Sequence, residues 1–533
     1  MQLTEKCVYE LLEDNARDFP DKEAYKFTGE SLNWAQFKLR VDEAARCISY
    51  LGVKKGTHAA IWSSNSLRWV ITYFALCKIG AISVLIAPAS SVCELSTLID
   101  YADCEYLFIG DSFKQVHTED SAMKLLNKNG KYYCEKLKAA FRMNRGKGRL
   151  SSADDLLKEV PDDYIPVYEK QHCMETINIL FTSGTTAMPK GVMLSHYNIV
   201  NNSKGIAECM GFDESDRFCL TVPLYHCFGL SGCTLACVHS KTTNIIMTHF
   251  QTAAVSDTLL NERCTAFSAV PTMLISLAEH AQANDLSYPL LKKGEIAGAI
   301  CTEQAFSRII KYLYSDIMVS YGQTEASPSV TFSLPGDSFE VRATTVGRPM
   351  PLVEVKMISL QTGEEVATGE SGEICVKGYN VMQGYYKMPE ATAKTIDKDG
   401  WLHTGDLGYF GDDGNIRITG RIKEMIIRGG DNISPYEIED ALMKLDEISL
   451  IKVIGVKDDY YQEEICACIM VKEGKTLTEQ QVRDFAAEQL SMFKQPRYIL
   501  FMDEFPITSS GKVKLADIKE IAEKMIEERK GLK

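Results

Sequence analysis

The stretch Phe181-Thr-Ser-Gly-Thr-Thr-Ala-Met-Pro-Lys-Gly-Val192 gathers hydroxyls, glycines and one lysine directly after the apolar run 177–181. Such a loop presents backbone N–H groups, side-chain hydroxyls and a cation to one anion, as a polyphosphate requires. It is not a Walker A loop, because Pro189 stands in place of the second glycine and Gly191 follows the lysine. We interpret it as a phosphate loop of another kind. The alternative is a polar surface turn after a buried strand.

On both sides of this loop, helical patterns alternate with short apolar runs that are typical of strands. Residues 70–79 are expected to form a helix and residues 80–87 a strand. Further strand-like runs follow at 217–222, 243–247, 266–270 and 317–321. This alternation predicts an α/β fold with β-α units on a parallel sheet. Residues 111–165 are richer in charge and glycine, and we expect them to form a peripheral excursion.

The predicted pattern of strands and helices changes twice after residue 340. Short strands separated by turns are expected first, at 353–358, 372–377 and 415–419. The last 110 or so residues then read as a small α/β unit, with strands at 450–456 and 464–471 and a helix at 478–490. We therefore predict a large N-terminal domain over residues 1–420, made of β-α sheet subdomains and a β-rich subdomain, and a small C-terminal α/β domain over residues 421–533.

Composition limits the classes of function. A chain of 533 residues exceeds what one hydrophobic core usually supports, and its net charge of −14 argues against a nucleic-acid binder. The 17 cysteines are scattered without zinc-site spacing, so we expect reduced, mostly buried thiols. We see neither a secretory signal at the N-terminus nor an apolar run long enough to cross a bilayer. We expect a soluble, cytoplasmic protein without stable membrane insertion.

Four more stretches follow the first in order: Tyr321-Gly-Gln-Thr-Glu325, Trp401-Leu-His-Thr-Gly-Asp406, Gly420-Arg-Ile-Lys-Glu-Met-Ile-Ile-Arg-Gly-Gly-Asp-Asn-Ile433 and Phe505-Pro-Ile-Thr-Ser-Ser-Gly-Lys-Val-Lys514. With the first loop they resemble the acyl-adenylate-forming superfamily, which holds acyl-CoA synthetases, luciferases and peptide-synthetase adenylation domains. The resemblance covers most of the chain. It implies a small C-terminal domain that moves, and it implies ATP, Mg²⁺ and CoA as cofactor and substrates.

The stretch 321–325 follows a predicted strand, where ligands of open α/β sheets gather. The hydroxyl of Thr324 can bind an α-phosphate oxygen, and Glu325 can hold Mg²⁺, which prefers oxygen ligands. The resemblance implies the same two roles. It also places the rest of the stretch in the nucleotide site: Tyr321, Gly322 and Gln323. The alternative is the capped start of a helix.

The resemblance implies further nucleotide contacts. Asp406 would accept hydrogen bonds from both ribose hydroxyls, and Arg421 would contact ribose or phosphate. Lys190 would act in catalysis within the phosphate loop, whose other expected ATP-binding residues are Thr182, Ser183, Gly184, Thr185 and Thr186. An isolated Thr-Gly-Asp is more often an Asx-type turn, and that alternative stays open for Asp406.

The C-terminal part carries the remaining expected roles. Lys423 falls on the hinge position of the family, and the glycines Gly429 and Gly430 would let backbone approach a pantetheine arm of CoA. Lys512 matches the lysine that enters the site for adenylation and neutralises charge on the carboxylate and the α-phosphate. The alternatives are a solvated hairpin rim for the charged run 421–428 and an ordinary surface lysine at 512.

The acyl pocket is expected around residues 223–230. In the family an aromatic residue or histidine gates the pocket at the position of His226. The alternative is a histidine that is only packed among apolar side chains, which is the usual case for a lone histidine. No acid lies nearby in the sequence, which counts against an amino-acid substrate. The following small, apolar run 230–238 suits a hydrocarbon chain. The residues expected to line the pocket are His226, Phe228, Gly229 and Gly298.

Three departures from the family pattern stand out. Ala187 replaces a glycine of the phosphate loop, which restricts φ > 0 there. Glu295-Ile-Ala-Gly-Ala-Ile300 replaces the commoner Gly-Gly-Ala-Pro segment that shapes the acyl pocket, which weakens any inference about chain length. In Tyr461-Gln-Glu463, Gln462 precedes the glutamate where a Gly-Glu pair is usual.

The sequence therefore predicts an enzyme that forms acyl-AMP from a medium- or long-chain aliphatic acid and ATP, releases pyrophosphate, and transfers the acyl group to CoA. One alternative is an adenylation enzyme that loads a carrier protein, because carrier and CoA both end in pantetheine. Another is a non-catalytic binding homologue. The sequence leaves the identity of the acid, the acceptor, the oligomeric state and the pathway open.

Overall fold

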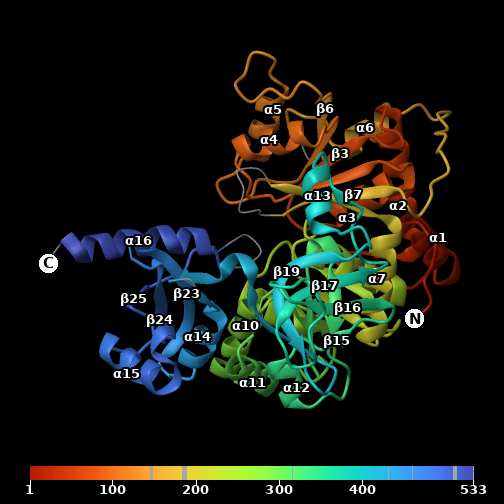
Figure 1. Ribbon diagram of the computed structural model, residues 1–533. Coiled ribbons are helices and arrows are strands. Elements are labelled where there is room, and N and C mark those ends of the chain that lie inside the picture. The colour runs from red at the N-terminus through yellow and green to blue at the C-terminus, as the bar shows by residue number, and fades with distance from the viewer. Residues whose placement is uncertain are drawn as a thin grey trace.

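A computed structural model describes residues 1–144, 148–182, 189–299, 301–314, 316–429, 431–458, 460–507 and 513–531. Helices and strands alternate along most of the chain, as expected for an α/β fold (Figure 1). The strands belong to five sheets. Within the described ranges, no helix is both long and apolar enough to cross a bilayer.

The largest sheet has seven strands in the order β18-β8-β7-β4-β3-β5-β6. They are β3 (His58–Trp62), β4 (Ile82–Ile86), β5 (Tyr106–Ile109), β6 (Ala139–Arg142), β7 (Thr176–Thr182), β8 (Lys190–Ser195) and β18 (Gly384–Tyr385). The five strands from β7 to β6 run parallel to one another, whereas β8 and β18 are antiparallel additions at one edge. The predicted parallel sheet is present, and the strands that flank the predicted phosphate loop in sequence, β7 and β8, lie toward its antiparallel edge.

Both faces of this sheet are buried, as expected when helices cover a parallel sheet. Along β3, Ala59 and Ile61 join one core, which includes most of α3 (Leu67–Ile79), while Ala60 and Trp62 join a second. Helices of this part are α1 (Val8–Asp18), α2 (Trp34–Tyr50), α4 (Val92–Tyr101), α5 (Thr118–Leu126), α6 (Ala153–Glu159) and α7 (His196–Cys209). In Figure 1, α4 and α5 lie at the top and α1 lies at the right.

Helix α3 shows why the sequence pattern was informative. Ser66 caps its N-terminus by accepting a hydrogen bond from the backbone N–H of Trp69 at 3.0 Å. Gly80 ends the helix in the left-handed region, at φ 82°. Almost every residue between these caps is buried, as expected for a helix that is apolar on all sides. The predicted helix at 70–79 and strand at 80–87 are both confirmed.

A second sheet has five strands in the order β11-β9-β10-β1-β2. They are β1 (Glu23–Phe27), β2 (Glu30–Asn33), β9 (Arg217–Leu220), β10 (Thr243–Ile246) and β11 (Ala266–Phe267). The predicted strand 266–270 is shorter than expected, because the chain leaves β9 after Phe267 and Ala269 bridges Ile296 of another sheet. Helices around this sheet are α8 (Ala236–Ser240), α9 (Thr252–Asn261) and α10 (Pro271–Ala283).

Two four-stranded sheets carry most of the remaining motifs. The first has the order β12-β13-β14-β15, with β12 (Glu295–Ile296), β13 (Met318–Gly322), β14 (Ser329–Phe332) and β15 (Arg348–Pro349). The second has the order β16-β17-β19-β20, with β16 (Val353–Ile358), β17 (Gly372–Gly378), β19 (Leu402–Phe410) and β20 (Ile416–Arg421). Their helices are α11 (Glu303–Tyr312), α12 (Phe339–Thr344) and α13 (Pro389–Thr395). The antiparallel second sheet agrees with the predicted short strands after residue 340.

The C-terminal part forms its own sheet, beside α10 and α11 in Figure 1. Its strands are β21 (Ile426–Arg428), β22 (Asp431–Ile433), β23 (Ile448–Asp458), β24 (Gln462–Val471) and β25 (Tyr498–Phe501), and its helices are α14 (Pro435–Leu442), α15 (Glu479–Gln489) and α16 (Leu515–Gly531). Thr478 caps the predicted helix at 478–490. Gln304 donates to Asp446 at 3.0 Å, a contact between the two parts. A domain boundary at residue 421 stays a prediction.

The expected excursion at 111–165 is only partly peripheral. β6 adds to the edge of the large sheet through parallel pairing with β5. Leu125 and Ala140 of this segment are buried in one core. Pattern alone missed the strand because it is four residues long and lies among charged, glycine-rich residues.

Gln462, where the family usually has glycine, begins β24 with φ 71°. A side chain strains this left-handed conformation and glycine does not. We expect Gln462→Gly to stabilise the protein by about 1 kcal/mol, measured as a higher urea midpoint. Gln462→Ala is the control, because it removes the amide but keeps Cβ. A gain with alanine equal to that with glycine would contradict the backbone explanation.

Candidate functional site

The two strands that flank the predicted phosphate loop in sequence pair with each other. β7 ends at Thr182, β8 begins at Lys190, and these two residues are paired in register. Both are partly exposed. Four other predicted ATP-binding residues of the loop lie outside the described residues: Ser183, Gly184, Thr185 and Thr186. Ala187, the departure from the family pattern, also lies outside them.

Tyr385 connects Lys190 with Glu325. The ammonium of Lys190 lies 4.4 Å from the centre of the Tyr385 ring, within the range of a cation–π contact. The hydroxyl of Tyr385 donates to Oε1 of Glu325 at 2.9 Å. Burial, and then the charge of Glu325, raise the pKa of Tyr385 well above its usual range, so it stays a neutral donor. The sequence prediction did not include Tyr385, and nothing in local spacing points to it.

The stretch 321–325 crosses from a strand into a single turn. Tyr321 and Gly322 end β13, and the three-residue 3₁₀ helix η2 (Thr324–Ala326) follows Gln323. The alternative of a capped helix start holds only in part, because the helix is a single 3₁₀ turn and Gln323 makes no side-chain cap hydrogen bond. The hydroxyl of Thr324 accepts a hydrogen bond from the thiol of Cys227 at 3.5 Å.

Asp406 is the centre of a second group of predicted residues. It lies on β19 directly opposite Arg421 of β20, is 3% exposed, and pairs with the Arg421 guanidinium. The hydroxyl of Tyr321 donates to its Oδ2 at 2.7 Å. Burial alone would lower the pKa of Arg421, but the hydrogen bond and charge of Asp406 outweigh it and raise that pKa. Side chains from two sheets bond this carboxylate, whereas an Asx-type turn would bond it to nearby backbone.

The donor set fits Mg²⁺ at Glu325 only together with a nucleotide. Mg²⁺ is usually bound by one or two carboxylates, with phosphates and waters as the other ligands. Glu325 supplies one such carboxylate, with Tyr385 bonded to one of its oxygens. Among the described side chains, the cluster of three possible metal ligands lies elsewhere: Glu373, Cys375 and His403. There the His403 Nδ1 lies 2.9 Å from a Glu373 oxygen, which is an ordinary hydrogen bond.

The predicted acyl-pocket residues come from two elements. His226 precedes the π-helix η1 (Phe228–Leu235) and lies with its ring 4.6 Å from that of Tyr225. A side chain at Gly229 would meet the backbone oxygen of Pro223 at 2.2 Å, so only glycine lets η1 pack there. Gly298 follows β12 with φ 85°. Segments of π-helix, such as η1, are frequent at functional sites.

Glu295, noted above only as a departure, lies fully buried on β12. Its Oε2 accepts a hydrogen bond from Ser320 of β13 at 2.6 Å. Burial raises the pKa of Glu295 to about 7, against a smaller opposing effect of the Ser320 hydrogen bond. No acid was expected near His226 from the sequence, but the fold brings this carboxylate close to Gly232 of η1.

We expect Glu295 to make stability depend on pH. Its pKa is about 7 in the folded protein against 4.5 for an ordinary glutamate, so between these values only the folded chain binds the proton. Stability then falls as pH rises through this window, by about 3 kcal/mol in total. Glu295→Gln should remove that slope. Urea unfolding at several pH values measures it, with the exposed Glu365→Gln as control. Equal slopes in wild type and Glu295→Gln would contradict the assignment.

The residues predicted for CoA and for the hinge lie at the start of the C-terminal part. Gly429 follows β21 with φ 60°, and its N–H donates to the carbonyl of Tyr461 at 2.9 Å. Arg428 stacks on the Tyr461 ring at 4.3 Å. Lys423 is exposed on the 3₁₀ helix η3 (Ile422–Glu424) between β20 and β21. Two further predicted residues lie outside the described part of the chain: Gly430 and Lys512.

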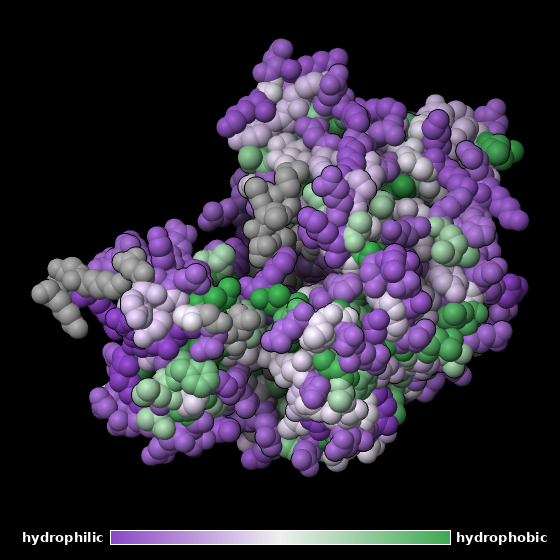
Figure 2. Space-filling view, in the orientation of Figure 1, coloured by the Kyte–Doolittle hydropathy of each residue, from purple (hydrophilic) through white to green (hydrophobic). Residues whose placement is uncertain are grey.

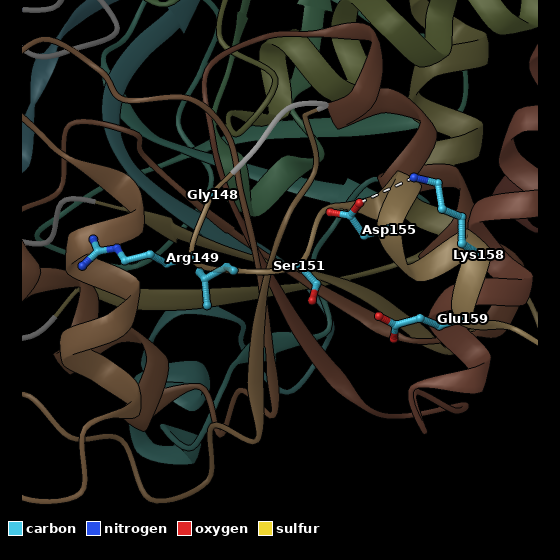
Figure 3. Close-up of a pocket in the computed structure, with 7 residues that line it drawn as sticks. Gly148, Arg149, Ser151, Asp155, Lys158 and Glu159 are labelled. Atoms are coloured by element: carbon cyan, nitrogen blue, oxygen red, sulfur yellow. Dashed lines mark ion pairs between the residues drawn. The ribbon is translucent and has the colours of Figure 1, made fainter.

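A surface hollow of about 440 Å³ lies away from these groups. It is lined by residues 148–151, Asp155, Lys158 and Glu159, all within the excursion. In Figure 3, Arg149 points away from the Asp155–Lys158 pair, whose charged atoms are 3.9 Å apart. Figure 2 shows hydrophilic residues over most of the face that is turned to the viewer. The hollow contains none of the predicted site residues.

Family comparisons confirm the resemblance that the motifs indicated. A family model described as AMP-binding enzyme matches residues 12–386, and one described as AMP-binding enzyme C-terminal domain matches residues 437–512. Protein YngI of Bacillus subtilis (strain 168), whose name marks it provisionally as an acyl-CoA synthetase, is 37% identical over 539 residues, covering 97% of each chain. The mitochondrial medium-chain acyl-CoA ligase ACSF2 of Rattus norvegicus is 35% identical, covering 97% of this chain and 88% of its own.

Solved structures show the same architecture. ATP-bound MatB from Rhodopseudomonas palustris aligns with a TM-score of 0.85 at 25% identity, covering 98% of this chain and 100% of that one. The o-succinylbenzoate CoA synthetase MenE from Bacillus subtilis, in complex with an acyl-adenylate intermediate, aligns with a TM-score of 0.82 at 25% identity, covering 97% and 99%. The predicted α/β fold, with a large N-terminal and a smaller C-terminal domain, is confirmed.

Proposed function

The chain belongs to the AMP-binding enzyme family, as an ATP-binding enzyme of the acyl-CoA synthetase type, and from this premise we propose that it activates a medium- or long-chain aliphatic acid as acyl-AMP and transfers the acyl group to CoA. The observation that carries the proposal is that Tyr321 of β13 and Arg421 of β20 both bond the buried carboxylate of Asp406 on β19. The name of the rat relative, a medium-chain acyl-CoA ligase, supports the substrate class.

The first step forms a bond between a carboxylate oxygen of the acid and the α-phosphorus of ATP, and it breaks the bond to pyrophosphate. Both reactants are anions, so the barrier comes largely from repulsion and positioning. A bound Mg²⁺ would neutralise charge on the phosphates. Lys190, held over Tyr385, places a fixed cation near Glu325, where this charge has to be offset.

The nucleotide is oriented by the second group. We assign the ribose hydroxyls to Asp406, whose carboxylate oxygens can accept more hydrogen bonds than the pair from Tyr321 and Arg421. Because Arg421 bonds the same carboxylate, it lies within reach of ribose and phosphate. Thr324 would bind an α-phosphate oxygen through its hydroxyl. Gly322 and Gln323 contribute backbone between these side chains.

The second step needs the thiol of CoA to attack the acyl carbonyl and expel AMP. The expected position of Lys512 during adenylation and the thiol's approach share one space, so the C-terminal part has to move. We assign the hinge to Lys423, which lies exposed between β20 and β21. Gly429 and Gly430 would then allow the pantetheine arm to pass close to the backbone.

Pyrophosphate release with ATP and Mg²⁺, over a panel of carboxylic acids with and without CoA, tests the proposal. We expect multiple turnovers that require both an aliphatic acid and CoA. A single-turnover burst that CoA does not release would favour a carrier protein as acceptor instead. ATP binding without turnover on any acid would favour a non-catalytic homologue and refute the proposal.

A further inference from the structure

Glu295 has one carboxylate oxygen without a partner. The side chain is fully buried on β12, and its Oε2 accepts from Ser320 at 2.6 Å. Its Oε1 makes no hydrogen bond within the described part of the structure. A buried carboxylate oxygen without a partner is unfavourable. The retained oxygen therefore suggests that a partner is supplied by a ligand.

The free oxygen faces the element expected to form the wall of the acyl pocket. A Cβ placed on Gly232 of η1 would lie 3.7 Å from this Oε1 and 3.0 Å from the Phe228 ring. The carboxylate and the aromatic ring therefore approach the same glycine from two elements. β12 itself leads directly to Gly298, another residue predicted for the pocket. Glu295 therefore lies next to the predicted pocket wall on η1 and three residues before Gly298.

Within the described part of the chain, no basic side chain acts on this carboxylate. Ser320 is the hydrogen-bonding side chain that acts on the pKa of Glu295, and no lysine or arginine contributes. The titratable groups that sense its charge are Cys233 of η1, Cys209 of α7 and Tyr314 after α11. Burial keeps all three neutral, because it raises the pKa of each group. Oε1 therefore has no donor among the described residues, and a substrate can provide one.

We propose that Glu295 is a specificity-determining residue of this ligase, and that the preferred acids carry a hydrogen-bond donor, a hydroxyl or an amino group, on the chain away from the activated carboxylate. This inference rests on the proposed function. An unsubstituted chain leaves Oε1 unpaired. At pH values above 7 the Glu295 side chain is ionised, so a second carboxylate on the acid meets a like charge. A site built to bind a substrate donor discriminates strongly against the analogue that lacks it.

The test compares kcat/KM for pyrophosphate release with ATP, Mg²⁺ and CoA on matched acids of several chain lengths: unsubstituted, ω-hydroxy, ω-amino and dicarboxylic. The wild-type enzyme should prefer a donor-bearing acid over the unsubstituted one by about 10- to 100-fold at one chain length, mostly through KM. Glu295→Leu should reverse this preference. Glu295→Gln keeps an acceptor oxygen without the charge, so it should retain ω-hydroxy acids and lose ω-amino acids.

The control is Asn244→Leu, a buried polar-to-apolar change on β10 of another sheet, which should leave the ratio between acids unchanged. If Glu295→Leu does not fold, the ω-hydroxy to ω-amino ratio of Glu295→Gln decides instead. Equal kcat/KM for substituted and unsubstituted acids in the wild type, or an unchanged ratio in the variants, overturns the inference while the ligase activity stands. Absence of pyrophosphate release with every acid refutes the proposed function and the inference with it.

Discussion

Lys512→Ala is expected to lower acyl-AMP formation by about 10²–10³-fold while leaving thioester formation from supplied acyl-AMP nearly unchanged. The lysine matches the family residue that neutralises charge on the reacting carboxylate and α-phosphate. That charge develops only in the first half-reaction. The second half-reaction starts from a mixed anhydride whose leaving group is already in place, so it does not need the same cation.

Two assays separate the half-reactions. Pyrophosphate release reports adenylation, and acyl-CoA formation from chemically prepared acyl-AMP reports thioester formation. Lys514→Ala is a matched control, because Lys514 lies two residues further on and its ammonium is 3.5 Å from Asp517. Equal loss of both half-reactions in Lys512→Ala would show that the lysine is needed throughout, and the division of roles would then be wrong.

Glu325→Gln is expected to lower pyrophosphate release by a similar factor, about 10²–10³-fold, and to raise the Mg²⁺ concentration needed for half-maximal rate. The substitution keeps the shape of the side chain and an oxygen for the Tyr385 hydroxyl. It removes the negative charge that suits a hard cation. It also removes a fixed charge from the chain of contacts that ends at Lys190.

A titration of the rate with Mg²⁺, at saturating ATP and acid, distinguishes this role from general damage to the site. The exposed Glu390→Gln on α13 is the control, since it changes the same charge outside the site. A lower rate with an unchanged Mg²⁺ requirement would assign Glu325 to positioning through Tyr385 rather than to the metal.

Local patterns predicted the elements where strong periodicity and caps coincide. α3 and β4 lie where the run 70–87 placed them, and β16 has the predicted bounds 353–358. Prediction failed where pairing with a distant strand decides the outcome. β11 is cut short because Ala269 pairs with Ile296, and β6 exists because β5 offers an edge to it.

The same distinction holds for the candidate site. The sequence named Lys190, Glu325, Asp406 and Arg421 because each lies in a short motif whose order can be read along the chain. It did not find Tyr385, which reaches the site only because β18 pairs with β8 and aligns Tyr385 with Val192. That pairing joins residues almost 200 positions apart.

By itself, therefore, the sequence determined the fold class, the family and the candidate residues within its five motifs. Those properties are encoded in spacing along the chain, which local propensity and motif chemistry can read. Only the tertiary structure decided that Tyr385 lies between Lys190 and Glu325, and that the Glu295 carboxylate faces Gly232. Contacts of this kind depend on which strands become neighbours and which face each side chain takes, and a one-residue shift of register would reverse that face.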